Sequence, residues 1–320
     1  MNTLPRIPLC GMSMGKRAKA DLSLVIITFI WGSTFVVVKN ALADVSVFVF
    51  LASRMALASL LLALIFHRQL RGAKRETLLA ASQIGFFLIV GYACQTTGLL
   101  YTTPSKSAFI TGLSVVLVPL LVAAFYGKKI NRWTGLGVFV ALLGLYFLTI
   151  PAGPFRVNRG DLWTLAGACA FAGHIVLIER YSPKMPTAWL TLGQIVTGAL
   201  LASALVPATS LLGLEAPRLR PGHDFLLALA ITGILGTALA FSVQVWAQQF
   251  TSATHTAIIF SLEPVFAGIT SYIFYGERLG GRATIGATLI LAGILLAELK
   301  GPAPAAVESP APIQPEERNP

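Results

Sequence analysis

The sequence predicts an all-α integral membrane protein with ten transmembrane helices, built as two inverted five-helix repeats. Three observations predict this fold: an apolar composition, ten apolar stretches long enough to cross a bilayer, and an internal repeat of five stretches. The chain has 320 residues, of which 55% are apolar and 12% are charged, and its mean hydropathy is +0.76. Soluble domains carry about 25% charged residues, so this composition disfavours a soluble enzyme, a disordered chain and a disulfide-stapled domain.

The apolar stretches follow one another with short connections. A helix needs about 20 apolar residues to cross about 30 Å of hydrocarbon. The predicted spans are 22–40, 46–66, 77–99, 105–126, 133–151, 161–179, 186–207, 224–247, 253–275 and 281–299. No connection is long enough for a soluble domain. Residues 1–20 form a basic leader, and residues 301–320 are rich in Pro, Ala and Glu and are expected to be a disordered tail.

Several spans carry charges or other features that need an explanation. The first span follows a basic segment, a pattern that a signal peptide shares, but its counterpart later in the chain favours a retained helix. The second span contains Arg54 and the ninth contains Glu263, whereas the third to fifth have no formal charge apart from Lys106. The tenth is short, and Arg282 and Glu298 at its ends could snorkel to the interface.

Basic residues in the loops predict the orientation. The leader, the loop between spans two and three and the loop between spans four and five hold eleven Lys and Arg residues, against two in the alternate loops of the first half. Because positive loops stay in the cytoplasm, the N-terminus is predicted to be cytoplasmic, and the count of ten spans places the C-terminus there too. The net charge of +11 then reflects topology, so the expected partner is the lipid bilayer and not nucleic acid. The sequence leaves a homodimer open.

The sequence also repeats itself. At an offset of 140 residues Asp21-Leu22 aligns with Asp161-Leu162, and an offset of 149 aligns the third to fifth spans with the eighth to tenth. The aligned pairs include Trp31/Phe171, Thr34/His174, Lys39/Glu179, Arg54/Gln194, Gln95/Gln244, Gly137/Gly286 and Gly144/Gly293. The repeats cover residues 21–151 and 161–299, and nine extra residues lie between spans seven and eight. Because five is odd, the second repeat runs inverted, which is typical of secondary transporters; duplication in a non-transporting membrane protein is the alternative.

Several short motifs occur in the order found in one transporter family. They are Trp31-Gly32-Ser33-Thr34-Phe35, Arg54, Gln95-Thr96-Thr97-Gly98-Leu99-Leu100-Tyr101-Thr102, Glu263-Pro264 and Gly276-Glu277-Arg278. Over about residues 20–299 the chain resembles drug/metabolite transporters of the EamA type. One departure is Gly127-Lys128-Lys129, where the family usually has Gly-Glu in the first repeat as well. The resemblance implies a carrier of small polar or charged metabolites, with export as its direction.

Polar side chains within the spans are candidates for a substrate site, because in hydrocarbon they are costly unless they face a cavity or a partner. The repeat relates two polar stripes: Ser107, Thr111 and Ser114 in the fourth span, and Thr256, Phe260 and Glu263 in the ninth. Each stripe lies on one helix face, so the two could line a central cavity. Glu263 is predicted to bind an amino or cationic group or to exchange a proton; the alternative is a structural carboxylate beside the Pro264 kink.

Other candidates flank these stripes. His174 is a candidate substrate ligand or proton relay, or else a hydrogen-bonded packing residue. Gln95 and Gln244 either bind a polar substrate or join helices. The predicted substrate-binding residues are Trp31, Thr34, Tyr92, Gln95, Ser107, Thr111, His174, Gln244, Phe260 and Glu263. Glu263 and His174 are the candidates for proton coupling.

Three further charges have mainly structural explanations. Arg54 either attracts an anionic substrate or pairs with a carboxylate or a helix C-terminus, and the matched Gln194 favours a structural role. Lys39 and Glu179, at matching helix ends, are interpreted as boundary charges. The aligned glycines of the fifth and tenth spans predict close helix packing.

We therefore expect a secondary transporter in the cell inner (plasma) membrane that moves a small polar metabolite, amino acid-like or related, outward by alternating access. An intramembrane enzyme and a lipid-translocating or structural membrane protein are the alternatives. The sequence contains no recognisable catalytic motif, ATP-binding loop or metal-ligand cluster, so enzyme activity, a cofactor and a metal site are not expected. Its three cysteines are widely spaced and imply no disulfide framework.

Overall fold

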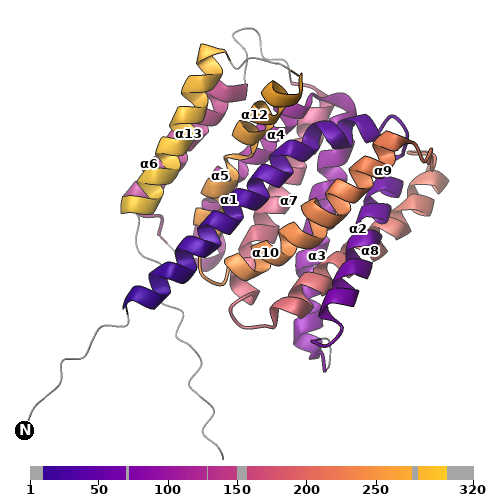
Figure 1. The fold of residues 1–320 in the computed structure, drawn as a ribbon, viewed down its shortest axis with the longest axis horizontal. Helices are drawn as coiled ribbons and strands as arrows, with labels where there is room; N and C mark the ends of the chain where they lie inside the picture. Colours follow the sequence, from indigo (N-terminus) through magenta and orange to yellow (C-terminus); the bar gives the residue numbers. More distant parts are fainter. Residues whose placement is uncertain (1–9, 70–71, 128, 150–156, 276–279, 301–320) are drawn as a thin grey trace, which may run out of the picture.

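The computed structural model describes residues 10–69, 72–127, 129–149, 157–275 and 280–300, and these residues are almost entirely helical. The elements in chain order are α1 (Cys10–Ala41), α2 (Val47–Phe66), α3 (Arg75–Tyr101), α4 (Pro104–Gly112), α5 (Ser114–Tyr126), α6 (Arg132–Thr149), α7 (Arg159–Tyr181), α8 (Thr187–Leu211), α9 (His223–Ala230), the π-helix η1 (Ile231–Leu239), α10 (Ala240–Ala247), α11 (Ala253–Phe260), α12 (Glu263–Tyr275) and α13 (Gly281–Lys300). Figure 1 shows how these helices pack side by side. The predicted tail and residues 1–9 of the predicted leader lie outside the described residues.

The all-α membrane fold is confirmed, and each predicted span corresponds to a helix or to consecutive helical segments. Within the described residues, seven helical stretches are long and apolar enough to cross a membrane. The fifth and tenth spans are shorter apolar helices, α6 and α13. The fourth and ninth spans, predicted as continuous helices, are each broken in two.

The ninth span breaks where its proline removes a backbone hydrogen bond. Pro264 has no N–H to donate to the carbonyl of Phe260, and α11 ends at Phe260. The chain then restarts as α12 at Glu263. The fourth span breaks at the matching place, because α4 ends at Gly112 and α5 begins at Ser114. The repeat therefore places an interruption of the helix at the same position in both halves of the molecule.

The two half-helices that precede these breaks also begin alike. Thr103 caps α4, and its hydroxyl accepts a hydrogen bond from the backbone N–H of Lys106 at 3.3 Å. Ser252 caps α11, and its hydroxyl accepts from the N–H of His255 at 3.2 Å. These are N-cap bonds of the usual kind, and they fix where each half-helix starts.

Helices from the two repeats are exchanged between two bundles. In the first bundle, α1 packs against α9, η1 and α10 and against α11 and α12. In the second bundle, α7 packs against α3 and against α4 and α5. Each bundle therefore combines one helix of one repeat with two spans of the other, and the repeat relates the two bundles. The helices α2 and α8 pack on each other, on η1 and on α3, behind both bundles.

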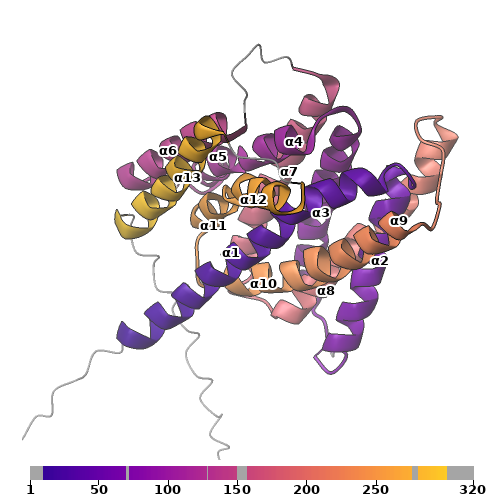
Figure 2. The same ribbon diagram turned by 45° about the horizontal axis from the view of Figure 1, so that its top comes forward.

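The helices α6 and α13 form a separate pair at one side of the molecule (Figures 1 and 2). A Cβ atom added to Gly137 would lie 2.6 Å from the carbonyl oxygen of Gly293, and one added to Gly144 would lie 2.7 Å from that of Gly286. The backbones are thus in contact, and only glycine fits. The close packing predicted for these glycines occurs within one chain.

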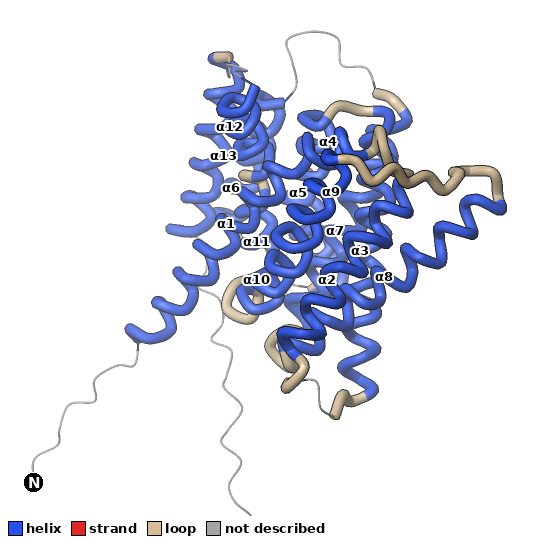
Figure 3. The backbone as a smooth tube through the Cα atoms, turned by 45° about the vertical axis from the view of Figure 1, so that its right-hand side comes forward, coloured by secondary structure: helices blue, strands red, loops and turns tan. Residues whose placement is uncertain are grey.

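The nine extra residues before the eighth span fall in the loop that joins α8 to α9 (Figure 3). The carboxylate of Glu215 accepts hydrogen bonds from the backbone N–H groups of Val47 at 2.8 Å and Phe48 at 3.3 Å. Arg218 donates to the carbonyl of Leu42 at 2.9 Å. The insertion therefore caps the start of α2, which lacks a side-chain cap of its own, and holds the chain just after α1.

Candidate functional site

A cavity lies between the two bundles and encloses about 730 Å³ of space not filled by protein atoms, part of it open to solvent. Nine of the ten predicted substrate-binding residues line this cavity: Trp31, Thr34, Tyr92, Gln95, Thr111, His174, Gln244, Phe260 and Glu263. The tenth, Ser107, is fully buried away from it. Residues that are distant in the sequence thus meet at one site.

Glu263 is the acidic residue of the cavity wall. It is the first residue of α12, directly after the break in the ninth span, and it is 8% exposed. Within the described part of the chain its carboxylate has no hydrogen bond or ion pair, although it lines the cavity. Ser114, the matching residue at the start of α5, also lines the cavity. The two helix breaks therefore face the same space.

The backbone at Glu263 is held by α1. A Cβ atom added to Gly32 would lie 2.5 Å from the carbonyl oxygen of Glu263 and 3.1 Å from the backbone nitrogen of Ala267. Gly32 is the neighbour of Trp31, which lines the cavity. Close backbone contact between α1 and α12 therefore determines where the carboxylate stands.

Aromatic rings from both bundles form much of the wall. Trp31 lies edge-on to Phe260, with 5.1 Å between ring centroids, and its indole N–H donates to the carbonyl of Gly236 at 2.8 Å. Tyr92 lies edge-on to Phe171, at 5.3 Å. Phe241 contacts Trp31, Tyr92 and His174, with centroids 5.4 to 6.1 Å apart. Such rings offer an apolar surface with a favourable face for cations.

Phe171 and Phe241 line the cavity although the sequence motifs do not single them out. The repeat carries the signal that finds them. Phe171 aligns with Trp31 and Phe241 aligns with Tyr92, and both of these partners are predicted substrate-binding residues. Both rings are found when each predicted substrate-binding residue, aromatic or polar, is aligned with its counterpart in the other repeat.

Arg54 also lines the cavity, but its guanidinium is bound by neutral groups. It donates to the hydroxyl of Thr237 at 2.9 Å and to the hydroxyl of Tyr92 at 3.3 Å. The guanidinium carbon also lies 4.3 Å from the centroid of the Tyr92 ring. Within the described residues it pairs with neither a carboxylate nor a helix C-terminus, the partners that a structural role predicts. The arginine instead joins α2, α3 and η1.

The amides and the histidine have partners within the wall. His174 Nε2 lies 2.8 Å from Gln194 Oε1, a contact that fits the packing interpretation of this histidine. Gln95 donates to the hydroxyl of Thr111 at 2.9 Å. Gln244 donates to Gln248 at 3.0 Å, while its own carbonyl oxygen is buried without a partner among the described residues. The matched glutamines therefore differ in their partners although both reach the cavity.

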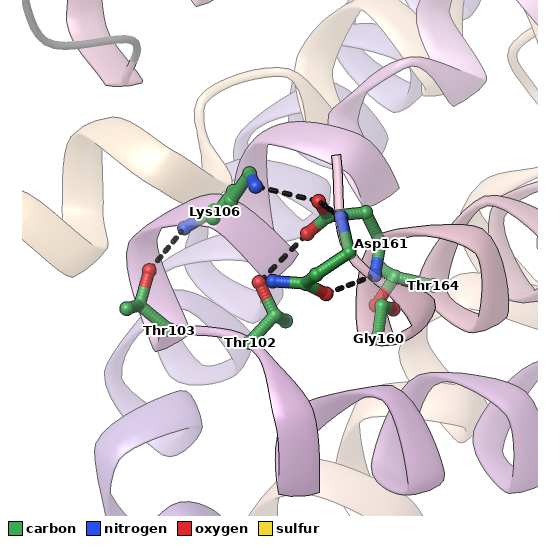
Figure 4. A network of polar contacts seen from close by, with 7 residues as sticks. Thr102, Thr103, Lys106, Gly160, Asp161 and Thr164 are labelled. Carbon is green, nitrogen blue, oxygen red and sulfur yellow. Dashed lines mark hydrogen bonds and ion pairs between the residues drawn. The ribbon is translucent and has the colours of Figure 1, made fainter. Parts of the chain in front are cut away.

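A carboxylate contacts a basic side chain of another helix within each bundle. Lys106 on α4 lies 2.5 Å from a carboxylate oxygen of Asp161 on α7, and Thr102 donates to the other oxygen at 2.8 Å (Figure 4). At the matching place in the first bundle, His255 on α11 lies 3.5 Å from Asp21 on α1. These contacts support each bundle as a unit.

Comparisons with known proteins agree with this architecture. The profile of the EamA-like transporter family matches residues 18–150 and 158–299. An "Uncharacterized transporter" of Archaeoglobus fulgidus is 34% identical over 285 residues, which cover 89% of this chain and 87% of that protein. The "Uncharacterized transporter YoaV" of Bacillus subtilis is 21% identical over 287 residues, covering 87% of this chain and 96% of the relative. A solved structure described as "Crystal structure of protein" superposes with a TM-score of 0.72 at 19% identity, over 88% of this chain and 97% of that one.

Proposed function

Because this chain belongs to the EamA-like transporter family, we propose that its central cavity carries a small polar metabolite with an amino group, amino acid-like or related, out of the cell. The chain is a multi-pass membrane protein of a transporter family. We place it in the inner (plasma) membrane with both termini in the cytoplasm, from the loop charges of its first half and the count of ten spans. The observation that carries the proposal is the carboxylate of Glu263, which faces the cavity without a partner among the described residues.

The chemistry of the wall favours an amine as the group that is recognised. A carboxylate that faces a cavity in a membrane is satisfied by a cation or by protonation. The cationic residue of the wall, Arg54, already donates to two hydroxyl groups. A ligand ammonium group would therefore find an acceptor at Glu263, and the rings of Trp31 and Phe260 would contact its apolar part.

The exchanged bundles supply the moving parts for alternating access. Packing is extensive within each bundle and is reinforced by the contact of Lys106 with Asp161 in one and of His255 with Asp21 in the other. Rocking one bundle against the other would open the cavity at one face and close it at the other. The units that move are then the two bundles and not the two halves of the sequence.

The energy for transport comes from a gradient, since the sequence has no ATP-binding loop. Glu263 is our candidate for proton coupling, because a carboxylate that binds either a proton or an amine can exchange one for the other. His174 is the second candidate, although its bond to Gln194 favours a structural role. The outward direction rests on the resemblance to exporters of this family.

The substrate class can be tested with amines and their neutral analogues. Purified protein is screened by thermal shift against a metabolite library in which each amine is paired with its N-acetylated form. Stabilisation by amines, together with saturable counterflow of the hits in proteoliposomes, is the expected result. Equal stabilisation by the acetylated forms would exclude recognition of the amine, and the absence of saturable flux for every hit would exclude a carrier.

Proton coupling has a separate test. Uptake is measured in proteoliposomes with and without a pH gradient, for the wild type and for Glu263→Gln. The gradient should drive accumulation in the wild type and not in the variant. The exposed acid Glu76 provides the matched control, because Glu76→Gln removes a carboxylate that does not line the cavity. Gradient-driven accumulation that persists in Glu263→Gln would remove Glu263 from the coupling role.

A further inference from the structure

The cavity extends between α1 and α3 toward the face opposite the start of α1. Phe35 and Val38 on α1 and Thr96 and Leu99 on α3 line this part of it. Both helices end within two turns of these residues, at Ala41 and Tyr101. Since α1 belongs to the first bundle and α3 to the second, an opening between their ends would lead out of the cavity.

Lys39 bridges this place. Its ammonium group donates to the carbonyl of Leu99 and, at 3.3 Å, to the carbonyl of Thr102. The residue next to it, Val38, lines the cavity, as Leu99 does. The last carbonyls of a helix lack partners within the helix and attract cations. The bond therefore joins the two bundles at the end of the cavity, where α1 and α3 make few other contacts.

A second bond joins the bundles at the opposite face. Gln248 follows α10 of the first bundle, and its amide donates to the carbonyl of Ile175 on α7 of the second bundle at 2.9 Å. Ile175 lines the cavity, as does Gln244, which lies one turn before Gln248. This bond thus stands at the other end of the same cavity.

The repeat explains why the two ends use different residues. Lys39 aligns with Glu179, and Leu99 aligns with Gln248. A carboxylate cannot donate to a carbonyl, so Glu179 cannot repeat the role of Lys39. At that end the donor comes from the other helix of the pair, as the amide of Gln248. Each end therefore has a hydrogen bond between the bundles, and in both bonds the donor belongs to the first bundle.

We propose that Lys39 and Gln248 close the two ends of the central cavity, and that each bond must break for the cavity to open at its face. This inference rests on the proposed function, since it assigns these residues to the transport cycle. The ion pair of Lys106 with Asp161 joins helices of one bundle and is not broken when the bundles separate. Lys39 is accordingly a gating residue and not only a boundary charge.

The test measures access to a cysteine in the cavity. In the full chain Cys10, Cys94 and Cys169 are replaced by serine, and Thr34→Cys supplies a reporter at a lining position. Sealed vesicles are treated from either face with a cationic or an anionic methanethiosulfonate, neither of which crosses the membrane. A separate variant, Lys184→Cys, marks the face at which α1 begins, because Lys184 is exposed in the loop after α7.

Lys39→Met keeps the side-chain length and removes the donor. Labelling from the face opposite the start of α1 should become about tenfold faster with both reagents, as expected for the loss of a hydrogen bond to a charged group. Lys39→Arg retains donors and should label like the parent. Gln248→Leu should accelerate labelling from the other face, so the inference is still tested if one of the two variants does not fold.

Two results would overturn the inference. Unchanged labelling rates in Lys39→Met and Gln248→Leu would show that neither bond limits access. Opposite effects on the cationic and the anionic reagent would show that Lys39 acts only through its charge. A parent protein whose reporter is labelled from neither face would instead contradict the proposed function, because it would lack a cavity accessible to water.

Discussion

Replacing Gly32 by alanine should lower transport, because it pushes α12 away from α1. The new Cβ would lie 2.5 Å from the carbonyl oxygen of Glu263 and 3.0 Å from the Cβ of Phe266. Non-bonded heavy atoms prefer about 3.5 Å or more, so α12 must move away from α1 by about 1 Å. Overpacking of this kind costs about 1–3 kcal/mol of stability. A displacement of about 1 Å at a binding group can lower function by about 100-fold, so we expect a loss of transport of about 10- to 100-fold.

The assay is counterflow of a screened amine in proteoliposomes, with the melting temperature of the same preparation measured alongside. Gly15→Ala is the matched control, since Gly15 lies in the same helix with open space around it. That variant should transport and melt like the wild type. Wild-type transport by Gly32→Ala would refute the argument that contact between α1 and α12 places the carboxylate.

Three further substitutions test the packing between helices by thermal unfolding. Arg54→Lys keeps the charge but loses the planar guanidinium that bonds two hydroxyl groups, so stability should fall by about 1–3 kcal/mol; an unchanged melting temperature would contradict this. Gly144→Ala places a Cβ 2.7 Å from a carbonyl of α13 and should destabilise by about 1–3 kcal/mol, whereas Gly135→Ala on the same helix makes only an ordinary van der Waals contact and should not. Asp161→Asn weakens the ion pair with Lys106 and should lower the melting temperature without changing which face of the cavity is accessible; a change in accessibility would show that this pair is also a gate.

The sequence is sufficient for what depends on local hydropathy and on the repeat. The spans follow from runs of apolar residues, and the glycine faces of the fifth and tenth spans follow from helical spacing. The repeat pairs Gln95 with Gln244 and Thr34 with His174, and all four side chains line the cavity. Pro264 indicates a kink in the ninth span, and in the structure the helix is interrupted just before it, between α11 and α12.

Other features depend on which helices pack together, which no local pattern specifies. The fourth span has no proline at its break. Its proline, Pro119, lies five residues after Ser114, the residue at which α5 begins. The partners of Arg54 come from α3 and from the π-helix, and a π-helix has no marker in the sequence. Lys39 has the pattern of a boundary charge because its partners are backbone carbonyls, whose identity depends on the exchange of helices between bundles.

The most direct test of a carboxylate-bearing cavity between two moving bundles is counterflow of one screened amine through the wild type and through Glu263→Gln in matched liposomes. Saturable exchange by the wild type that is lost in the variant, with both proteins equally folded, is the result that our account requires. Equal exchange by the two proteins would mean that the substrate does not bind at this carboxylate, and it would contradict the proposed site.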